Sequence, residues 1–342
     1  MSTLLRTVTP DLSDLSIAAK DYFVDAFNMY PMPFTEYFDI QTASLKSDKV
    51  SQLGGFTAPA EVGENVDFPE VTPEEGYDVT FTHLQYAQSF PISRLLQEDD
   101  PKGIYTALQS HARSHVRAMQ QKACLLAAAL ITGSMATAGP DGQYLIDTDH
   151  PTSPTIATTL SNKINTKLDA GGLAVQEMIT KIATNGKDMA GNQILYSRWK
   201  LVVPPALHAN ALKSCVALYG TPFVVSNVGV YSGVVGGNSS PTPIQTGAIF
   251  RQNTSTGATI EVVQDPFIGS GYSGGSDVKW YMVAAPEETA GFHSLRWYWR
   301  EAPTVLPVWQ NNVNKALHLD GVMRCSVGAI DFRHIWGSDG TV

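Results

Sequence analysis

The chain has 342 residues, of which 43% are hydrophobic and 16% are charged, and its formal net charge is -9. The length allows one to three domains and a sizeable core. The charged fraction is below the ~25% usual in soluble domains, so we expect part of the surface to be covered in an assembly. An acidic balance with no basic tail or basic block argues against tight direct binding of DNA.

Three cysteines, Cys124, Cys215 and Cys325, are too few and too scattered for a disulfide framework or a zinc site. We expect buried thiols in a reducing cytoplasm. The first residues lack a secretory signal pattern, and the longest apolar run, Cys124–Ile131, is far shorter than a membrane span. These features predict a soluble protein with no membrane partner.

The first predicted element is an amphipathic helix from Thr9 to Met29, capped by Thr9 and opened by Pro10. Its apolar side chains recur at helical spacing, at Leu12, Leu15, Ala19, Tyr22, Phe23 and Phe27. The segment Tyr30–Phe34 contains two prolines and is expected to end this helix in an extended conformation.

Two stretches with strand character follow, Tyr37–Leu53 and Tyr77–Ser93, and they predict a long hairpin. The segment between them is rich in Gly, Pro and Glu and has no helical period, so we expect a wide, acidic, mobile tip. A strand of about 15 residues reaches about 50 Å, and a two-stranded ribbon is marginally stable in water by itself. The hairpin is therefore expected to lie on another surface, and in a chain this poor in charge that surface is another subunit.

Residues Asp99–Gly133 predict one long helix. Asp99 and Asp100 precede a proline in the first turn, and Gly133 ends the helix. Its apolar stripe consists of Ile104, Leu108, His111, His115, Met119, Ala123, Leu126 and Leu130. At 1.5 Å per residue the helix is about 48 Å long. A compact chain of this size is about 50 Å wide, so we expect one helix to span the whole molecule.

The remainder of the chain combines two shorter helices with several strands. A loop at 138–155 contains a short strand, and glycine-rich turns separate the later strands. The predicted elements are a helix Ala170–Thr184 capped by Asp169, a buried strand Trp199–Val203, a helix Ala206–Leu218 opened by Pro204 and Pro205, strands within Thr221–Pro307, and a closing strand or hairpin within 322–337. This order is α+β, with strands segregated rather than alternating with helices.

Two glycine motifs overlap at Gly269–Gly275. The first matches the dinucleotide fingerprint GxGxxG and the second matches the GxSxG of hydrolases, with Ser273 in the nucleophile position. Both motifs need a helix directly after them, and here a strand is expected from Val278 to Ala284. We therefore interpret the segment as a turn and keep a hydrolase using Ser273 only as a minor alternative.

Three further clusters are interpreted as structural. His111 and His115 have a metal-capable spacing but no third ligand. The segment Asp147–His150 is assigned a capping and turn role, because cation loops need more oxygen ligands. The aromatic run Trp297–Trp299 is expected in the core or at an interface. We predict no catalytic residue, no cofactor and no metal.

The order of elements resembles the major capsid proteins of tailed bacteriophages, with the Hong Kong 97 fold. The phrases LIDTDHPT (145–152) and WKLVVPPALHANALK (199–213) are similar to the loop after the spine helix and to the entry into the axial domain of that family. The resemblance implies an α+β fold with an N-terminal arm (1–35), an extended β-hairpin loop (36–94), a peripheral domain (95–198) that includes the spine helix (99–133), an axial domain (199–303), and return strands to the peripheral domain (304–342).

The resemblance also implies a function. The chain is expected to be a non-enzymatic major head protein that forms hexamers and pentamers of an icosahedral shell around double-stranded DNA. Its partners would be copies of itself, a portal, a separate scaffolding protein, an optional decoration protein, and packaged DNA without sequence-specific binding. It would be assembled in the host cytoplasm and located in the virion. The alternative is an encapsulin-like compartment shell, which holds enzymes instead of DNA.

The expected assembly residues lie in the loop tip and on the later strands. The glycines let one tip sequence fit both five-fold and six-fold environments. The tip residues are Phe56 and the acidic Glu61, Glu64, Asp67, Glu70, Glu74 and Glu75. Their candidate partners on a neighbour are Arg296, Arg300, Arg324 and Arg333, and a merely solvated loop is the alternative.

Some members of the family join subunits through a lysine–asparagine bond. Lys46 and Lys49 lie in the loop, and Asn311, Asn312 and Asn314 lie late in the chain. The sequence shows no glutamate placed to catalyse the bond, so we do not expect it.

Overall fold

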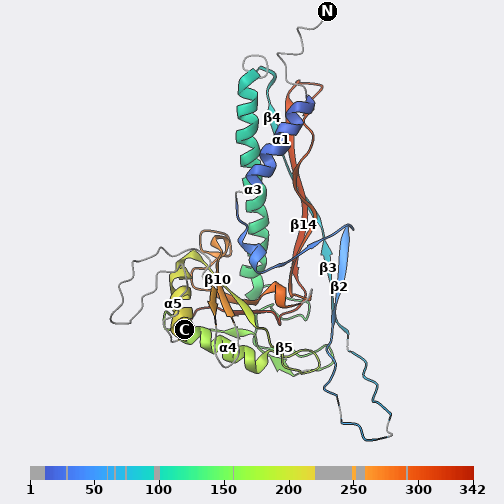
Figure 1. Cartoon of the computed structure of the whole chain (residues 1–342), viewed down its shortest axis with the longest axis vertical. Helices are drawn as coiled ribbons and strands as arrows, with labels where there is room; N and C mark the ends of the chain where they lie inside the picture. Colours follow the sequence, from blue (N-terminus) through green and yellow to red (C-terminus); the bar gives the residue numbers. More distant parts are fainter. Residues whose placement is uncertain are drawn as a thin grey trace, which may run out of the picture.

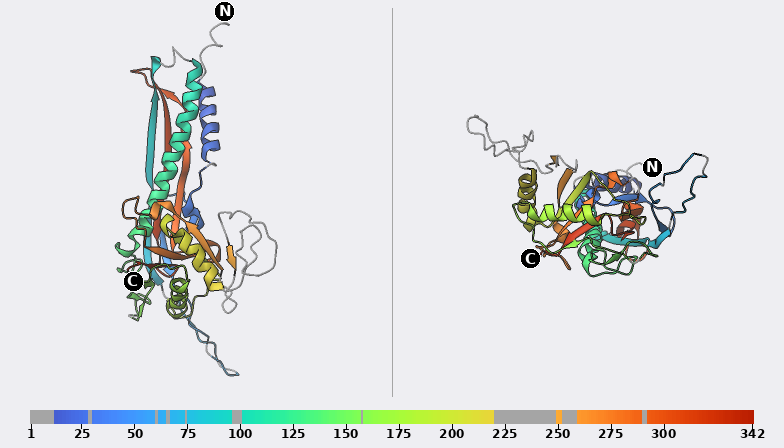
Figure 2. Two further views of the ribbon diagram at one scale, coloured as in Figure 1. Left: turned by 90° about the vertical axis from the view of Figure 1, so that its left-hand side faces the viewer. Right: turned by 90° about the horizontal axis from the view of Figure 1, so that it is seen from below.

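The structure is a computed structural model and describes residues 12–27, 30–59, 61–64, 67–73, 75–95, 101–156, 158–219, 249–251, 259–289 and 292–342. They form an elongated molecule (Figure 1). A shaft contains two helices and a five-stranded sheet, a base contains a six-stranded sheet and two helices, and a two-stranded ribbon leaves the side of the molecule. The prediction that one helix spans a compact molecule was wrong, because the base lies beyond the end of that helix (Figures 1 and 2).

The long helix itself is confirmed as α3 (Pro101–Thr132). Ala112, Val116 and Ala127 are fully buried, whereas Leu126 and Leu130 are only half-buried. Of the predicted stripe, His115, Met119 and Ala123 are buried as expected, whereas toward the C-terminal end of the helix alanines rather than leucines face the sheet. Small side chains let α3 lie close to that sheet. Gly321 shows this closeness, since a Cβ there would lie 3.0 Å from His115 Nδ1.

The predicted first helix is confirmed as α1 (Leu12–Phe27), which packs along α3, and the expected cap at Thr9 lies outside the described residues. The Gln120 Nε2 donates hydrogen bonds to the carbonyl oxygens of Phe27 at 2.9 Å and Tyr30 at 3.3 Å. The segment after α1 is not fully extended, because a 3-10 turn η1 (Pro33–Glu36) places Phe34 in the core.

The shaft sheet combines segments from both ends of the chain. Its central strand, β14, pairs antiparallel with β12 and β13 on one edge and with β4 on the other, and β12 pairs in parallel with β1. The strands are β1 (Asp39–Thr42), β4 (Leu84–Ile92), β12 (Leu295–Val305), β13 (Trp309–Gln310) and β14 (Leu317–Ala329).

The prediction of one long hairpin was wrong in its pairing. Only β2 (Ser47–Leu53) and β3 (Glu75–Thr82) pair with each other, whereas β1 and β4 join the shaft sheet. His83 marks the change from ribbon to sheet. Its Nε2 is 2.8 Å from Asp48 Oδ2 and its Nδ1 is 2.9 Å from Ser326 Oγ. The true partner of β4 lies more than 220 residues away in sequence, which local alternation does not reveal.

The base sheet has the order β7-β15-β11-β8-β10-β9. Its central strand β8 is buried along Trp199–Val203, as predicted. The closing segment forms a long strand in the shaft and a short one here. The strands are β7 (Lys163–Ile164), β8 (Arg198–Val203), β9 (Ile249–Arg251), β10 (Thr259–Gln264), β11 (Trp280–Ala284) and β15 (Ile335–Ser338), and β5 (His150–Pro151) pairs separately with β6 (Thr159–Leu160).

Two predicted helices cover the base, α4 (Leu173–Asn185) and α5 (His208–Tyr219). The Asp169 carboxylate accepts hydrogen bonds from the backbone N–H groups of Gly171 and Ala174 at the start of α4, as expected of a cap. Short 3-10 turns occur at Gly133–Met135, Pro205–Leu207, Pro266–Ile268 and Pro286–Glu288. The strand expected at 222–232 lies outside the described residues.

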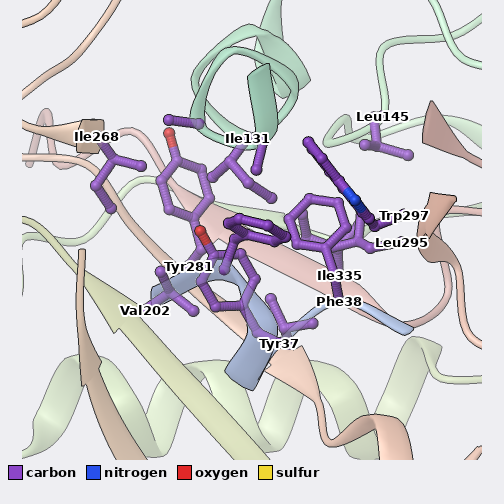
Figure 3. Close-up of a cluster of buried hydrophobic side chains, with 14 of the residues drawn as sticks. Tyr37, Phe38, Ile131, Leu145, Val202, Ile268, Tyr281, Leu295, Trp297 and Ile335 are labelled. Atoms are coloured by element: carbon purple, nitrogen blue, oxygen red, sulfur yellow. The ribbon is translucent and has the colours of Figure 1, made fainter. Parts of the chain in front are cut away.

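The main core joins shaft and base at the C-terminal end of α3 (Figure 3). Trp297 is fully buried there, 4.6 Å from the ring of Phe34 and 4.9 Å from that of Trp299. The predicted placement of this aromatic run in the core is confirmed. All three cysteine thiols are free and buried, and burial raises the pKa of Cys215 to about 12.

Two buried histidines lie where the two sheets meet. The His334 Nε2 is 2.6 Å from the Tyr196 hydroxyl, and its Nδ1 contacts Ser294 Oγ. The His293 ring stacks 5.5 Å away. Burial, and next the neighbouring His293, lower the pKa of His334 to about 3, and burial also lowers the pKa of His293. Both rings are therefore neutral in the folded chain near pH 7.

A buried tyrosine–carboxylate pair connects η1 to the base. The Tyr37 hydroxyl donates to Asp265 Oδ2 at 2.6 Å, and the backbone N–H of Phe267 donates to Oδ1 of the same carboxylate at 2.9 Å. Burial raises the pKa of Asp265, and the hydrogen bond from Tyr37 opposes that rise. The hydrogen bonds from Tyr37 and Phe267 therefore stabilise the ionised form of the Asp265 carboxylate.

We expect Tyr37→Phe to lower the free energy of unfolding by about 1–3 kcal/mol at pH 7, because it removes a donor from a buried carboxylate. Without this donor the pKa of Asp265 rises further. A buried carboxylic acid whose pKa is raised in the folded state destabilises the protein at pH values above that pKa. Below the pKa of the unfolded chain the destabilisation is absent, so the cost of Tyr37→Phe shrinks as the pH falls. Urea unfolding at pH 7 and pH 5 measures this. In Asp265→Asn the Tyr37 effect should not vary with pH, and an equal Tyr37→Phe penalty at both pH values in the wild-type background would contradict the explanation.

Candidate assembly surfaces

The ribbon is fixed to the body at its base. The Phe81 ring is buried 4.9 Å from that of Tyr298. It also lies over Gly328, where a Cβ would come within 2.7 Å of the ring. Gln52 connects the two ribbon strands to the body, because its Nε2 donates to the Ile330 carbonyl and its Oε1 accepts from the Tyr77 N–H.

Beyond this base the described tip residues leave the body (Figure 1). At Phe56 the arm is still held by the body, because Asn192 Nδ2 donates a hydrogen bond of 2.7 Å to the Phe56 carbonyl oxygen. Phe68 then exposes 85% of its surface and Val71 43%. An exposed phenylalanine on an extended segment without regular secondary structure is costly to leave in water. The tip therefore presents apolar surface that a neighbouring surface could cover.

Acidic and basic residues are segregated between the segment 50–93 and the helix α3. Residues 50–93 contain seven acidic residues and no lysine or arginine, whereas α3 contains four basic residues and no acidic one. The acidic tip residues that the structure describes, Glu61, Glu64, Asp67, Glu70 and Glu75, are all exposed, and Glu74 lies outside the described residues.

The arginines predicted as partners of the tip differ in their availability. Arg333 is only 6% exposed, and its guanidinium is held by the Asp331 carboxylate at 2.8 Å and by two backbone carbonyls. It is therefore a buried structural residue. Arg296 lies 3.1 Å from the Tyr298 hydroxyl and 3.9 Å from Asp39. Arg324 lies 3.4 Å from Glu301, and Arg300 is half-buried on β12.

The lysines of the loop lie on the ribbon side of the molecule. Lys46 is exposed, and Lys49 pairs with Asp78 at 2.6 Å across the ribbon. The three asparagines considered for a covalent bond lie at the turn between β13 and β14, at the opposite end of the shaft (Figure 1). A bond between these sites within one chain is excluded by that separation.

The motifs interpreted as structural have structural contacts. Residues 269–274 form turns followed by β11, not by a helix. His150 stacks 3.8 Å from the Phe332 ring and lies 2.6 Å from Asp141. His111 stacks 3.7 Å from the Phe90 ring. Among the described residues there is no cluster of three metal-ligating side chains and no helix long and apolar enough to cross a membrane.

The described residues thus form a shaft that carries an exposed arm, with acidic residues concentrated toward the arm and basic residues on α3. A family model described as phage capsid protein matches residues 76–337. The Mu-like prophage FluMu major head subunit of Haemophilus influenzae is 27% identical over 167 residues, which are 48% of this chain and 52% of that protein. The chain thus matches about half the length of this relative.

Two solved structures of phage capsids match the chain, and the first of them shows a similar fold. The capsid of cyanophage P-SCSP1u matches with a TM-score of 0.51 and 10% identity, over 89% of this chain and 86% of that one. The procapsid of bacteriophage JBD30 matches with a TM-score of 0.46 and 15% identity, over 96% and 74%. Since the family model covers most of the sequence, the chain belongs to the phage capsid protein family. Its mixed α+β capsid fold agrees with the prediction.

Proposed function

We propose that this chain is a major head protein that assembles with copies of itself into the icosahedral shell of a tailed phage, around double-stranded DNA. The observation that carries the proposal is the tip, where described residues from 57 to 73 leave the body without regular secondary structure and expose Phe68. Burial against a neighbour removes this apolar surface from water, at roughly 25 cal/mol for each Å². The chemistry is association and not turnover.

The proposed subdomains follow the resemblance. The arm (1–35), extended loop (36–94), peripheral domain (95–198), axial domain (199–303) and return strands (304–342) are assignments by analogy. The pairing of β14 with both β12 and β4 supports grouping Leu295–Val305 with the shaft, although the proposed axial boundary falls at 303. The shaft would then belong to the peripheral domain and the strands β8 to β11 of the base to the axial domain, whereas α4, β7 and β15 of the base fall outside the proposed axial range.

The proposed partners beyond other copies are a portal, a separate scaffolding protein, an optional decoration protein, and packaged DNA. The net charge of -9 supports contact with DNA that is weak and independent of sequence. A strongly basic surface would instead bind the DNA phosphates tightly and hinder movement of the DNA. We assign the assembled protein to the virion.

Deletion of residues 56–74 should leave a folded, soluble subunit that forms no shells, because the ribbon base at Phe81 and Gln52 stays in place while the arm is lost. Negative-stain electron microscopy of the expressed wild type and deletion chains measures this. Circular dichroism and thermal unfolding test whether the deletion chain is folded. Normal particles from the deletion chain would contradict the proposed role of the arm.

A further inference from the structure

An apolar groove lies between the ribbon and the C-terminal half of α3. It has a volume of about 670 Å³, and α3 contributes Leu126, Ala129 and Leu130 to it. The ribbon contributes Val79 and Phe81, and the unpaired edge of β14 contributes its last residues. This volume is in the range of protein sites that bury a sizeable apolar group.

Uncompensated positive charge lies at one end of this groove. Lys122 is exposed one helical turn before Leu126 and on the same side of α3, with its Nζ 5.3 Å from the Tyr86 ring centroid. Asp78 lines the ribbon side, but Lys49 pairs with it at 2.6 Å. The end of the groove toward the shaft is therefore positive, and α3 carries no acidic residue that would offset this.

The tip offers a matching group. Phe68 is 85% exposed, and Asp67 and Glu70 flank it. The tip of the same chain points away from its own groove, since β3 lines the groove and residues 67–73 lie beyond the far end of that strand (Figure 1). The matching groove is therefore that of another copy.

We propose that Phe68 of one copy inserts into the groove of a second copy, between Leu126 and Leu130 on one side and Val79 on the other. Asp67 and Glu70 then lie beside Lys122 of that second copy. This inference rests on the proposed function and specifies the surface that the arm contacts. The Phe68 side chain supplies binding energy by burial, and the carboxylates of Asp67 and Glu70 set the orientation of the tip in the groove. The acidic tip thus meets the shaft helix in place of the arginines of β12 and β14.

The groove is tested from both sides with matched controls. Ala129→Trp fills the groove from an exposed helix position, and Phe68→Ala removes the inserted side chain. Each should reduce the particle yield at least tenfold in electron micrographs and sedimentation. Ala118→Trp places the same bulk at an exposed position of α3 outside the groove, and Phe292→Ala removes an exposed phenylalanine that lies outside the tip; both should assemble like the wild type. Assembly by Ala129→Trp at the wild-type level would overturn the proposal.

Charge and proximity are tested separately. Asp67→Lys and Lys122→Glu should each lower the yield, and the two together should restore it. A chain with Phe68→Cys and Ala129→Cys should form disulfide-linked ladders when assembled particles are oxidised, since the native thiols are buried. Single-cysteine chains should not. Absence of the ladder, or a ladder from Leu5→Cys with Ala129→Cys instead, would assign the groove to another segment and contradict the proposal. Failure of the wild type to form particles would instead contradict the proposed function itself.

Discussion

Trp297→Ala is expected to lower the free energy of unfolding of the subunit by about 3–5 kcal/mol, the largest effect of any single truncation considered. The indole is fully buried between Phe34 and Trp299, at the point where shaft and base share one core. Its removal leaves a cavity that neither sheet can fill, because each is fixed by its own strand pairing. The loss should therefore affect both parts of the molecule in one transition.

Urea unfolding followed by tryptophan fluorescence and by far-ultraviolet circular dichroism measures this loss. Trp309→Ala is the matched control, since that indole is 45% exposed and should cost less than half as much. A Trp297→Ala chain as stable as the Trp309→Ala chain would contradict the shared core. Two separate transitions in the wild type would contradict it as well.

Acidification should destabilise the subunit through its buried histidines. The pKa of His334 is about 3 in the folded chain, because of burial and of the neighbouring His293, and about 6.5 when unfolded. The unfolded chain therefore binds more protons between these values, so stability is complete above pH 6.5 and is lost as the pH falls toward 3. The full loss is on the order of 5 kcal/mol, and about half of it is reached by pH 4.5.

The variant His334→Gln separates this effect from general acid unfolding. Glutamine keeps a donor and an acceptor for Ser294 and Tyr196 but binds no proton, so this chain should lose less stability than the wild type between pH 7 and pH 4.5. Unfolding in urea at pH 7, 6 and 4.5 measures the difference. Between pH 7 and pH 8 the two chains should change in parallel. Equal losses at pH 4.5 would show that His334 does not carry the acid sensitivity.

The sequence was informative where local patterns determine structure. The long helix and the two helices of the base follow from spacing, caps and prolines, and the apolar run at Trp199–Val203 predicts a strand buried on both faces. The placement of the acidic tip on an exposed arm also follows from composition, because residues 54–74 have neither helical nor strand periodicity and are rich in glycine, proline and glutamate.

The remaining features depend on contacts between distant segments. Strand β4 alternates like the arm of a hairpin, and only its pairing with residues 317–325 places it in the shaft. Arginine is usually found at the protein surface. Arg333 is buried because its guanidinium donates hydrogen bonds to the Asp331 carboxylate and to the carbonyl oxygens of Thr152 and Lys187. The groove at Ala129 could not be predicted from the sequence, because the residues that line it come from three separate parts of the chain.

The continuity between β3 and β4 has a mechanical consequence. Tension on the ribbon reaches the shaft through His83 and then acts along the axis of β4, whose residues from Leu84 to Ile92 are all in register with β14. Such a load shears the whole ladder at once, so its hydrogen bonds resist together and do not open one after another. The fold thus transmits a pull on the arm to the whole β4–β14 ladder rather than to one strand end.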